Sequence, residues 1–278
     1  MTPTPIKAFI FDWAGTMIDF GSCAPVVALQ NAFGDFGLEL SEAEARADMG
    51  MAKKAHIRAI LARAPMQAAF DAHMARPSGN DDIDRLFHLV EPHMIEAAAR
   101  FTDLIPGAVD LVDTLKSRGI RIGSGTGYSR SMMSTILRAA ADQGYRPECV
   151  VCAGETLEGR PSPLMTWKAM VDLGVWPARA CIKIDDAVVG VMEGREAGVF
   201  TIGVAASGNG VGLELQAFEG LDAADRHDKV RAAAQPLADA GADFVVASVA
   251  DILALLPELE DLIASGQKPG SRPCDIRL

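Results

Sequence analysis

Short apolar runs that alternate with helical patterns are the feature that most restricts the fold of this sequence. Polar or glycine-rich residues bound each run, which is the pattern of strand–helix–strand units in a parallel sheet. We expect strands at residues 6–11, 120–124, 149–152, 181–184 and 200–204, with a sixth at 244–246. Helices are expected between them at residues 108–117, 129–141, 163–173 and 188–197. Right-handed crossovers would join these elements into an α/β fold with a doubly wound parallel sheet.

The first two expected strands are separated by a stretch that is far too long for a single crossover. Its pattern is helical almost throughout, with expected helices at residues 25–33, 41–49, 53–62 and 81–99. We therefore expect residues 21–102 to form an inserted all-helical domain, and residues 1–20 and 103–278 to form the core domain. The glycine- and proline-rich tail after Ser265 is expected to be loosely ordered.

The composition favours a protein that acts on small molecules. The formal net charge is −11 and there is no long basic run, so a polyanion such as DNA would be repelled. No apolar stretch approaches the roughly 20 residues that cross a bilayer, and the first residues lead directly into a strand instead of a signal-peptide core. We expect a cytoplasmic protein with no nucleic-acid or membrane partner.

The five cysteines are scattered and odd in number, so we expect free thiols and no disulfide framework. Cys149 and Cys152 have the redox spacing C-x-x-C, but they fall in an expected strand, where residues i and i+3 point to opposite faces. A buried strand explains this pair better than a redox or metal site does.

Polar side chains follow several of the expected strands directly. In an open parallel sheet, ligands bind beyond the carboxyl ends of the strands, so these side chains would share one crevice. Carboxylates there would bind a hard divalent cation, while hydroxyl, amide and guanidinium groups would bind phosphoryl oxygens. The residues concerned are Asp12, Thr126, Gly127, Arg160, Asp185 and Asp186.

Asp12 is the candidate nucleophile of this crevice. A carboxylate can attack an anionic phosphoryl group only where other groups neutralise the charge. The alternative is that Asp12 caps the following turn and that Asp185 or Asp186 caps the following helix. Capping explains each acid separately, but it does not explain why all of them follow strands.

The insert contains a second candidate, Lys53. Lys53 and His56 are spaced i, i+3 on one side of an expected helix, and Gly50 lets that helix approach the crevice. Lysine on a helix is usually a solvated surface group, and His56 alone could be an ordinary buried histidine. Lys54 points about 100° away from Lys53 around the helix, so we expect it in solvent or beside acidic partners.

The run from Phe11 to Thr16, FDWAGT, resembles the first motif of the haloacid dehalogenase (HAD) superfamily, D-x-D-G-T, with Ala14 at the second acid. In the phosphatases of that superfamily the second aspartate protonates the leaving group, and general-acid catalysis of this kind contributes about 10²–10⁴ in rate. A lysine imine could instead accept the electrons released when a carbon–phosphorus bond breaks. Ala14 together with Lys53, in M-G-x-x-K-x-x-H, resembles the phosphonoacetaldehyde hydrolases over about residues 9–253.

The resemblance implies a Rossmann-like core with a helical cap, and hydrolysis of phosphonoacetaldehyde through a lysine Schiff base and an aspartyl phosphate. It implies a homodimer and Mg²⁺ as cofactor. The implied roles are Asp12 as nucleophile, Lys53 for the imine and His56 for proton transfer; Asp12, Asp186 and the Ala14 carbonyl for Mg²⁺; Thr126, Gly127 and Arg160 for phosphoryl oxygens; and Met49 and Tyr128 as pocket lining.

Two positions depart from the family pattern. Ser22 stands where some relatives carry cysteine, and Gly190 stands where some carry another aspartate. Two other functions stay open at this point: a HAD-type phosphatase acting on another small phosphorylated substrate, and a catalytically silent binding protein that kept the fold.

Overall fold

The computed structural model describes residues 4–278, and its centre is a seven-stranded sheet in which every neighbouring pair is parallel. The strand order is β3-β2-β1-β4-β5-β6-β7. The strands are β1 (Ala8–Phe11), β2 (Arg121–Thr126), β3 (Cys149–Cys152), β4 (Cys181–Asp185), β5 (Phe200–Val204), β6 (Phe244–Val246) and β7 (Asp275–Arg277). All six expected strands are present, and β1 lies between β2 and β4, so the loops that follow these three strands meet at one edge.

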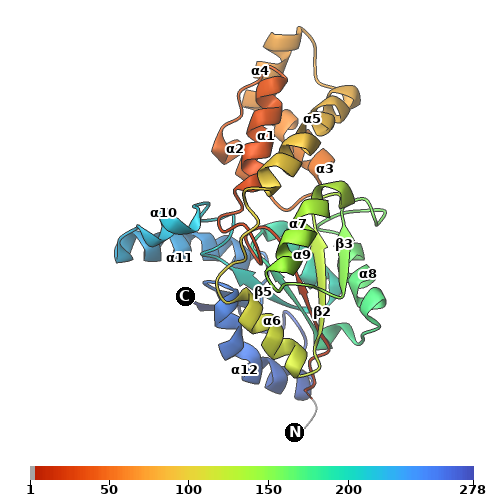
Figure 1. Cartoon of the computed structure of the whole chain (residues 1–278), viewed down its shortest axis with the longest axis vertical. Helices are drawn as coiled ribbons and strands as arrows, with labels where there is room; N and C mark the ends of the chain where they lie inside the picture. The colour runs from red at the N-terminus through yellow and green to blue at the C-terminus, as the bar shows by residue number, and fades with distance from the viewer. Residues whose placement is uncertain (1–3) are drawn as a thin grey trace.

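Helices cover both faces of the sheet (Figure 1). Because successive strand residues point to opposite faces, Phe9 and Phe11 belong to one buried cluster and Ala8 and Ile10 to another. The first cluster includes residues of α6 (Ala108–Ser117), α7 (Arg130–Asp142) and α12 (Ile252–Ala264); α8 (Leu164–Leu173), α9 (Val188–Ala197) and α11 (Ala223–Asp239) cover the other face, and α10 is Leu215–Glu219. The doubly wound α/β fold expected from the sequence is confirmed.

Between β1 and α6, five helices form a group that stands beyond the sheet, at the top of Figure 1. They are α1 (Ala24–Asp35), α2 (Glu42–Arg46), α3 (Lys53–Ala62), α4 (Ala64–Met74) and α5 (Asn80–Ala98). The helix α4 was not among those expected from the sequence. Pro65 stands in its first turn, where proline needs no hydrogen-bond partner. The helix expected at 41–49 ends at Arg46.

The expectation of a loosely ordered tail was wrong. Residues Asp275–Arg277 form β7, which pairs in parallel with β6 at the edge of the sheet. Arg277 also forms ion pairs with Glu258 and Asp275. This strand escapes a search for apolar runs because backbone hydrogen bonds and charged side chains hold it.

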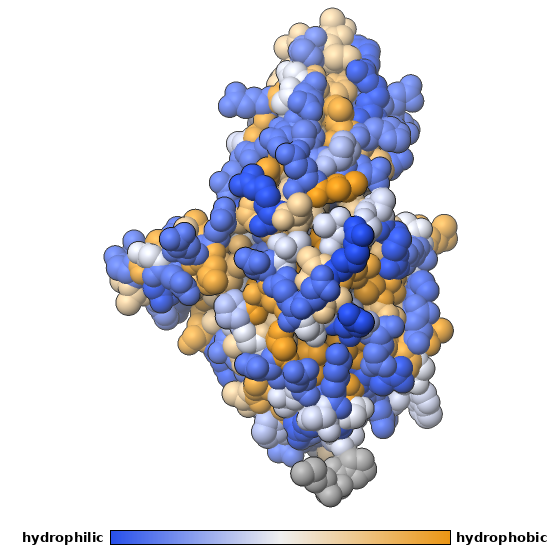
Figure 2. Space-filling model, viewed as in Figure 1, coloured by the Kyte–Doolittle hydropathy of each residue, from blue (hydrophilic) through white to orange (hydrophobic). Residues whose placement is uncertain are grey.

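The surface in Figure 2 is largely hydrophilic, with apolar residues in patches between polar ones. No helix among residues 4–278 is long and apolar enough to span a bilayer. All five cysteines are free thiols, as expected.

Candidate functional site

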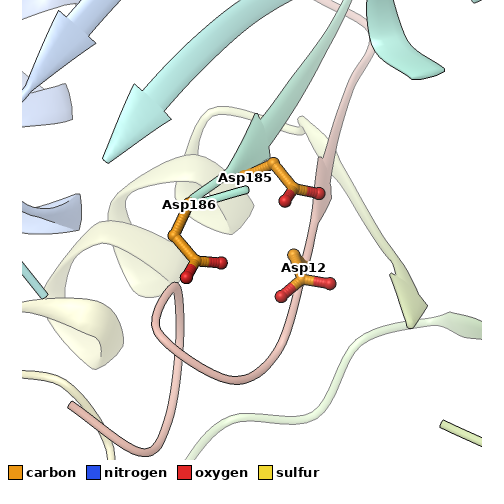
Figure 3. Close-up of side chains that lie close together, drawn as sticks. All are labelled: Asp12, Asp185 and Asp186. Atoms are coloured by element: carbon orange, nitrogen blue, oxygen red, sulfur yellow. The ribbon is translucent and has the colours of Figure 1, made fainter. Parts of the chain in front are cut away.

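Three buried aspartates meet at the carboxyl ends of β1 and β4. Asp12 directly follows β1, while Asp185 ends β4 and Asp186 comes next. Because Phe11 of β1 is in register with Ile184 of β4, the carboxylates come together, as Figure 3 shows. One oxygen from each lies within 4.8 Å of the other two.

The crowding of these acids changes their pKa values. Burial, and then the charges of Asp12 and Asp185, raise the pKa of Asp186 well above its ordinary value. Burial also raises the pKa of Asp12 to about 6, although Arg160 opposes the shift. Burial acts in the same direction on Asp185, but Arg160 and Lys183 outweigh it and lower its pKa. A cluster of buried carboxylate oxygens that repel one another fits a hard divalent cation.

Asp12 and Asp186 border a cavity of about 20 Å³, which is space for little more than one water molecule. Side chains from the core and from the inserted helices line it together. The lining residues are Asp12, Ala14, Ser22, Pro25, Met49, Gly50, Met51, Lys53, Thr126, Gly127, Tyr128, Arg160, Asp186 and Ala187. Of the ten residues assigned site roles from the sequence, nine line this cavity, and His56 is the exception.

Lys53 is the first residue of α3 and is only 3% exposed. Its Nζ lies 5.3 Å from the centre of the Tyr128 ring. Burial lowers the pKa of Lys53 from 10.5 to about 8, although Asp12 opposes the shift. The neighbouring Lys54 pairs with Asp84 at 2.7 Å and has a half-exposed side chain, as the sequence predicted.

Two glycines let the insert press against the core above the cavity. A Cβ at Gly127 would lie 2.8 Å from the Met51 carbonyl oxygen and 2.9 Å from that of Gly50. Gly50 has a φ of +92°, and a Cβ there would lie 2.9 Å from both Ala187 and Val189. A side chain at either position would force the two parts of the chain away from each other.

Arg160 crosses the floor of the site among buried carboxylates. Its Nη1 lies 2.7 Å from Asp12 Oδ1, its Nε donates to Glu193 at 2.8 Å, and its Nη2 lies 3.4 Å from Asp185. Lys183 lies 2.5 Å from Asp185 and 3.5 Å from Glu193. Sequence reasoning missed Lys183 and Glu193; the available signal was a lysine inside an expected apolar strand.

Thr126 and Tyr128 bring hydroxyl groups to the cavity from the end of β2. Thr126 Oγ1 accepts a hydrogen bond from the Tyr128 backbone N–H at 3.1 Å. The Tyr128 hydroxyl is buried and has no hydrogen-bond partner within residues 4–278, and burial raises its pKa. The cavity therefore keeps polar groups available for a ligand.

His56 is fully buried on α3, three residues beyond Lys53, but it does not line the cavity. Neither ring nitrogen forms a hydrogen bond within the part of the chain that the structure describes. Burial, and then the charges of Lys53 and Arg63, lower the pKa of His56 to about 3, so the ring is neutral. Its role in proton transfer stays a prediction.

The departure at Gly190 has a structural explanation. A Cβ on Gly190, in the first turn of α9, would lie 2.0 Å from the Asp185 carboxyl carbon. The Asp185 carboxylate thus fills the space that a side chain at position 190 would need. An acid at that point of the site comes from β4 in this chain.

Two comparisons of the sequence place this arrangement among known proteins. A family model described as a haloacid dehalogenase-like hydrolase matches residues 6–198. A phosphonoacetaldehyde hydrolase from Paraburkholderia phytofirmans is 41% identical over 264 residues, covering 95% of this chain and 99% of that protein. Another, from Vibrio cholerae, is 39% identical over 271 residues, covering 97% and 100%.

Solved structures give the same picture. A phosphonoacetaldehyde hydrolase-like protein from Oleispira antarctica is 40% identical and superposes with a TM-score of 0.94, over 96% of this chain and 97% of that one. A β-phosphoglucomutase from Clostridium difficile superposes with a TM-score of 0.67 at 17% identity, covering 94% and 99%, which shows a shared fold alone.

Proposed function

This chain belongs to the phosphonoacetaldehyde hydrolases within the haloacid dehalogenase-like hydrolases, and on that premise we propose that it hydrolyses phosphonoacetaldehyde to acetaldehyde and phosphate. The observation that carries the proposal is the cavity that Lys53 and Asp12 line together. The amine comes from the inserted helices and the carboxylate from the sheet. Ala14, which cannot protonate a leaving group, lines the same cavity.

The reaction begins when the neutral amine of Lys53 condenses with the aldehyde, which releases water and forms an imine. Asp12 then attacks phosphorus through a carboxylate oxygen. The carbon–phosphorus bond breaks, and its electron pair moves through carbon to the protonated imine nitrogen, which gives an enamine on Lys53. This electron sink removes the need for an acid at position 14.

Two water molecules complete the cycle. One attacks phosphorus of the aspartyl phosphate, which releases phosphate and restores Asp12. The enamine takes a proton on carbon, and the second water hydrolyses the resulting imine to acetaldehyde and free Lys53. Since imine formation released one water, the net reaction consumes one.

The metal in this proposal is Mg²⁺, held by Asp12, Asp186 and the Ala14 carbonyl. When bound, it neutralises charge so that a carboxylate can approach an anionic phosphoryl group. Asp186 accepts a hydrogen bond from the Asn209 backbone N–H at 2.8 Å, which fixes one of its oxygens. Thr126, Gly127 and Arg160 would bind phosphoryl oxygens.

We assign residues 21–102 to a cap domain, and residues 1–20 with 103–278 to the core. The close contact of Gly50 and Met51 with Gly127 supports this division, because all three residues line the cavity between the two parts of the chain. A closed cap keeps water from the reacting groups while the imine forms and the bond breaks.

The direct test is to supply phosphonoacetaldehyde and Mg²⁺ and to measure acetaldehyde with an alcohol dehydrogenase coupling, and phosphate separately. The two products should appear in equal amounts. Phosphate without acetaldehyde, or turnover of ordinary phosphate esters at a comparable rate, would instead favour a phosphatase.

A second test identifies the amine. Borohydride added with substrate should inactivate the enzyme by reducing the imine, and peptide mass mapping should place the adduct on Lys53. Lys54→Arg, the matched control, should still be trapped, whereas Lys53→Arg should not be. An adduct on Lys54, or none at all, contradicts the mechanism.

A further inference from the structure

Arg46, the last residue of α2, joins the inserted helices to the core. Its Nη1 donates to the Gly21 carbonyl at 2.9 Å and to Asn209 Oδ1 at 3.2 Å, and its Nη2 donates to the Gly212 carbonyl at 2.9 Å. Its Nε donates to Glu42 at 2.8 Å within α2. One guanidinium therefore connects a cap helix, the segment that leaves the core, and the loop after β5.

Asn209 bonds to Arg46 through its side chain and to Asp186 through its backbone N–H. Its Nδ2 donates to the Arg46 carbonyl at 3.1 Å, so the two residues are bonded in both directions. Its backbone N–H donates to Asp186 Oδ2 at 2.8 Å. Two residues thus span the distance from the cap to a carboxylate of the site.

The loop that carries Asn209 is fitted closely on both sides. Gly212 has a φ of +70°, and a Cβ there would lie 2.8 Å from Arg46 Cζ. A Cβ at Gly208 would lie 2.5 Å from the Asp186 Cβ. Because there is so little free space on either side, we expect a shift of Arg46 to displace the loop toward Asp186.

We propose that Arg46 and Asn209 are positioning residues that couple the closed position of the cap to the orientation of Asp186. When the cap closes, Arg46 fixes the loop after β5, and the Asn209 amide then holds Asp186 as a ligand for the metal. When the cap opens, this alignment relaxes. The inference rests on the proposed function, and it adds that cap closure and metal binding support each other.

The test compares Arg46→Ala with Arg63→Ala. Arg63 is also a cap arginine that bonds within the cap, to Asp48 and the Glu44 carbonyl, but it makes no bond to the described residues of the core. Mn²⁺ serves as the probe, and its binding is followed from the free Mn²⁺ signal in electron paramagnetic resonance. Residues that orient a metal ligand typically change metal affinity by about 10-fold or more, so Arg46→Ala should weaken Mn²⁺ binding by about 10-fold. Arg63→Ala should bind as the wild type does.

Asn209→Ala is the second variant, because it removes both side-chain bonds to Arg46 and keeps the backbone bond to Asp186. It should weaken Mn²⁺ binding to a similar extent. The double variant should bind Mn²⁺ no more weakly than either single variant, since both single variants remove the bond between Arg46 Nη1 and Asn209 Oδ1. Should Arg46→Ala lose its native circular dichroism spectrum, Asn209→Ala decides alone. Arg46→Lys should recover only part of the affinity.

Steady-state kinetics supply the other readout. Both variants should need about 10-fold more Mg²⁺ for half-maximal turnover, whereas a brace that only supports the cap would raise KM for substrate and leave the Mg²⁺ requirement unchanged. Mn²⁺ affinity within twofold of wild type in both variants overturns the inference. If the wild type releases no acetaldehyde but the affinities fall as described, the proposed reaction fails and the coupling stands.

Discussion

Replacing Lys53 with methionine should abolish turnover and, at the same time, increase the free energy of unfolding. Methionine has a similar length and leaves the buried position without an amine. Burial lowers the pKa of Lys53 from 10.5 to about 8, so at pH 7 the folded protein holds a proton less tightly than the unfolded chain does. That difference corresponds to about 3 kcal/mol of lost stability, which the substitution would recover.

The stability difference between the wild type and Lys53→Met should depend on pH in a defined direction. The unfolded chain binds more protons at this site between about pH 8 and 10.5, so wild-type stability rises with pH there relative to the variant. Urea unfolding should therefore show a gain of about 3 kcal/mol for Lys53→Met at pH 7 and about half of that at pH 9.5.

Lys54→Met is the matched control. Its side chain is half-exposed, so its stability should change by no more than about 0.5 kcal/mol and its turnover should persist. The reasoning is refuted if Lys53→Met is less stable than the wild type, or if its gain is the same at both pH values.

Three other outcomes follow from the same geometry. Gly127→Ala should lower kcat/KM by about 10-fold or more, because its Cβ would press on the backbone carbonyls of the cap. Gly34→Ala is the control, since its Cβ would meet no described atom within 4 Å, and it should leave kcat/KM unchanged. Equal kcat/KM values for the two variants would contradict the close contact between cap and core. Initial rates should rise with pH to a plateau above about 8 as Lys53 becomes neutral, and a rise that continues to 10.5 would mean that the amine is solvated. Asp185→Gly should destabilise the fold by about 3–5 kcal/mol, because Lys183 and Arg160 would lose an ion-pair partner. Adding Gly190→Asp should recover much of that stability, since the new carboxylate would take the place of the Asp185 carboxylate. If denaturant unfolding shows no gain in stability for the double variant, the exchange is disproved.

The sequence predicted most of the site because simple rules govern its parts. A parallel sheet brings strand ends together, so Asp12, Thr126 and Asp186 could be grouped without coordinates. Ala14 cannot protonate a leaving group, so the sequence predicted that another residue, Lys53, assists bond cleavage. These inferences needed only strand order and the chemistry of single residues.

Other contacts depend on how segments that are distant in sequence pack together, and no local sequence pattern predicts them. Arg46 and Asn209 look like ordinary polar residues in a helix and a loop until the fold brings them together. Glu193, another partner of Arg160, was missed for the same reason, since it lies 33 residues away from Arg160 in the sequence. The expected homodimer stays a prediction that sedimentation would test.

The small volume of the cavity determines when substrate and product can pass in the proposed catalytic cycle. A cavity of about 20 Å³ is too small for phosphonoacetaldehyde, so the proposed mechanism requires the cap to lift for substrate entry and for phosphate release. In the proposed mechanism, opening of the cap would expose Lys53 to water, where the amine would regain its proton. Closure would bury the amine again and lower its pKa, so the neutral nucleophile would be restored once in each turnover.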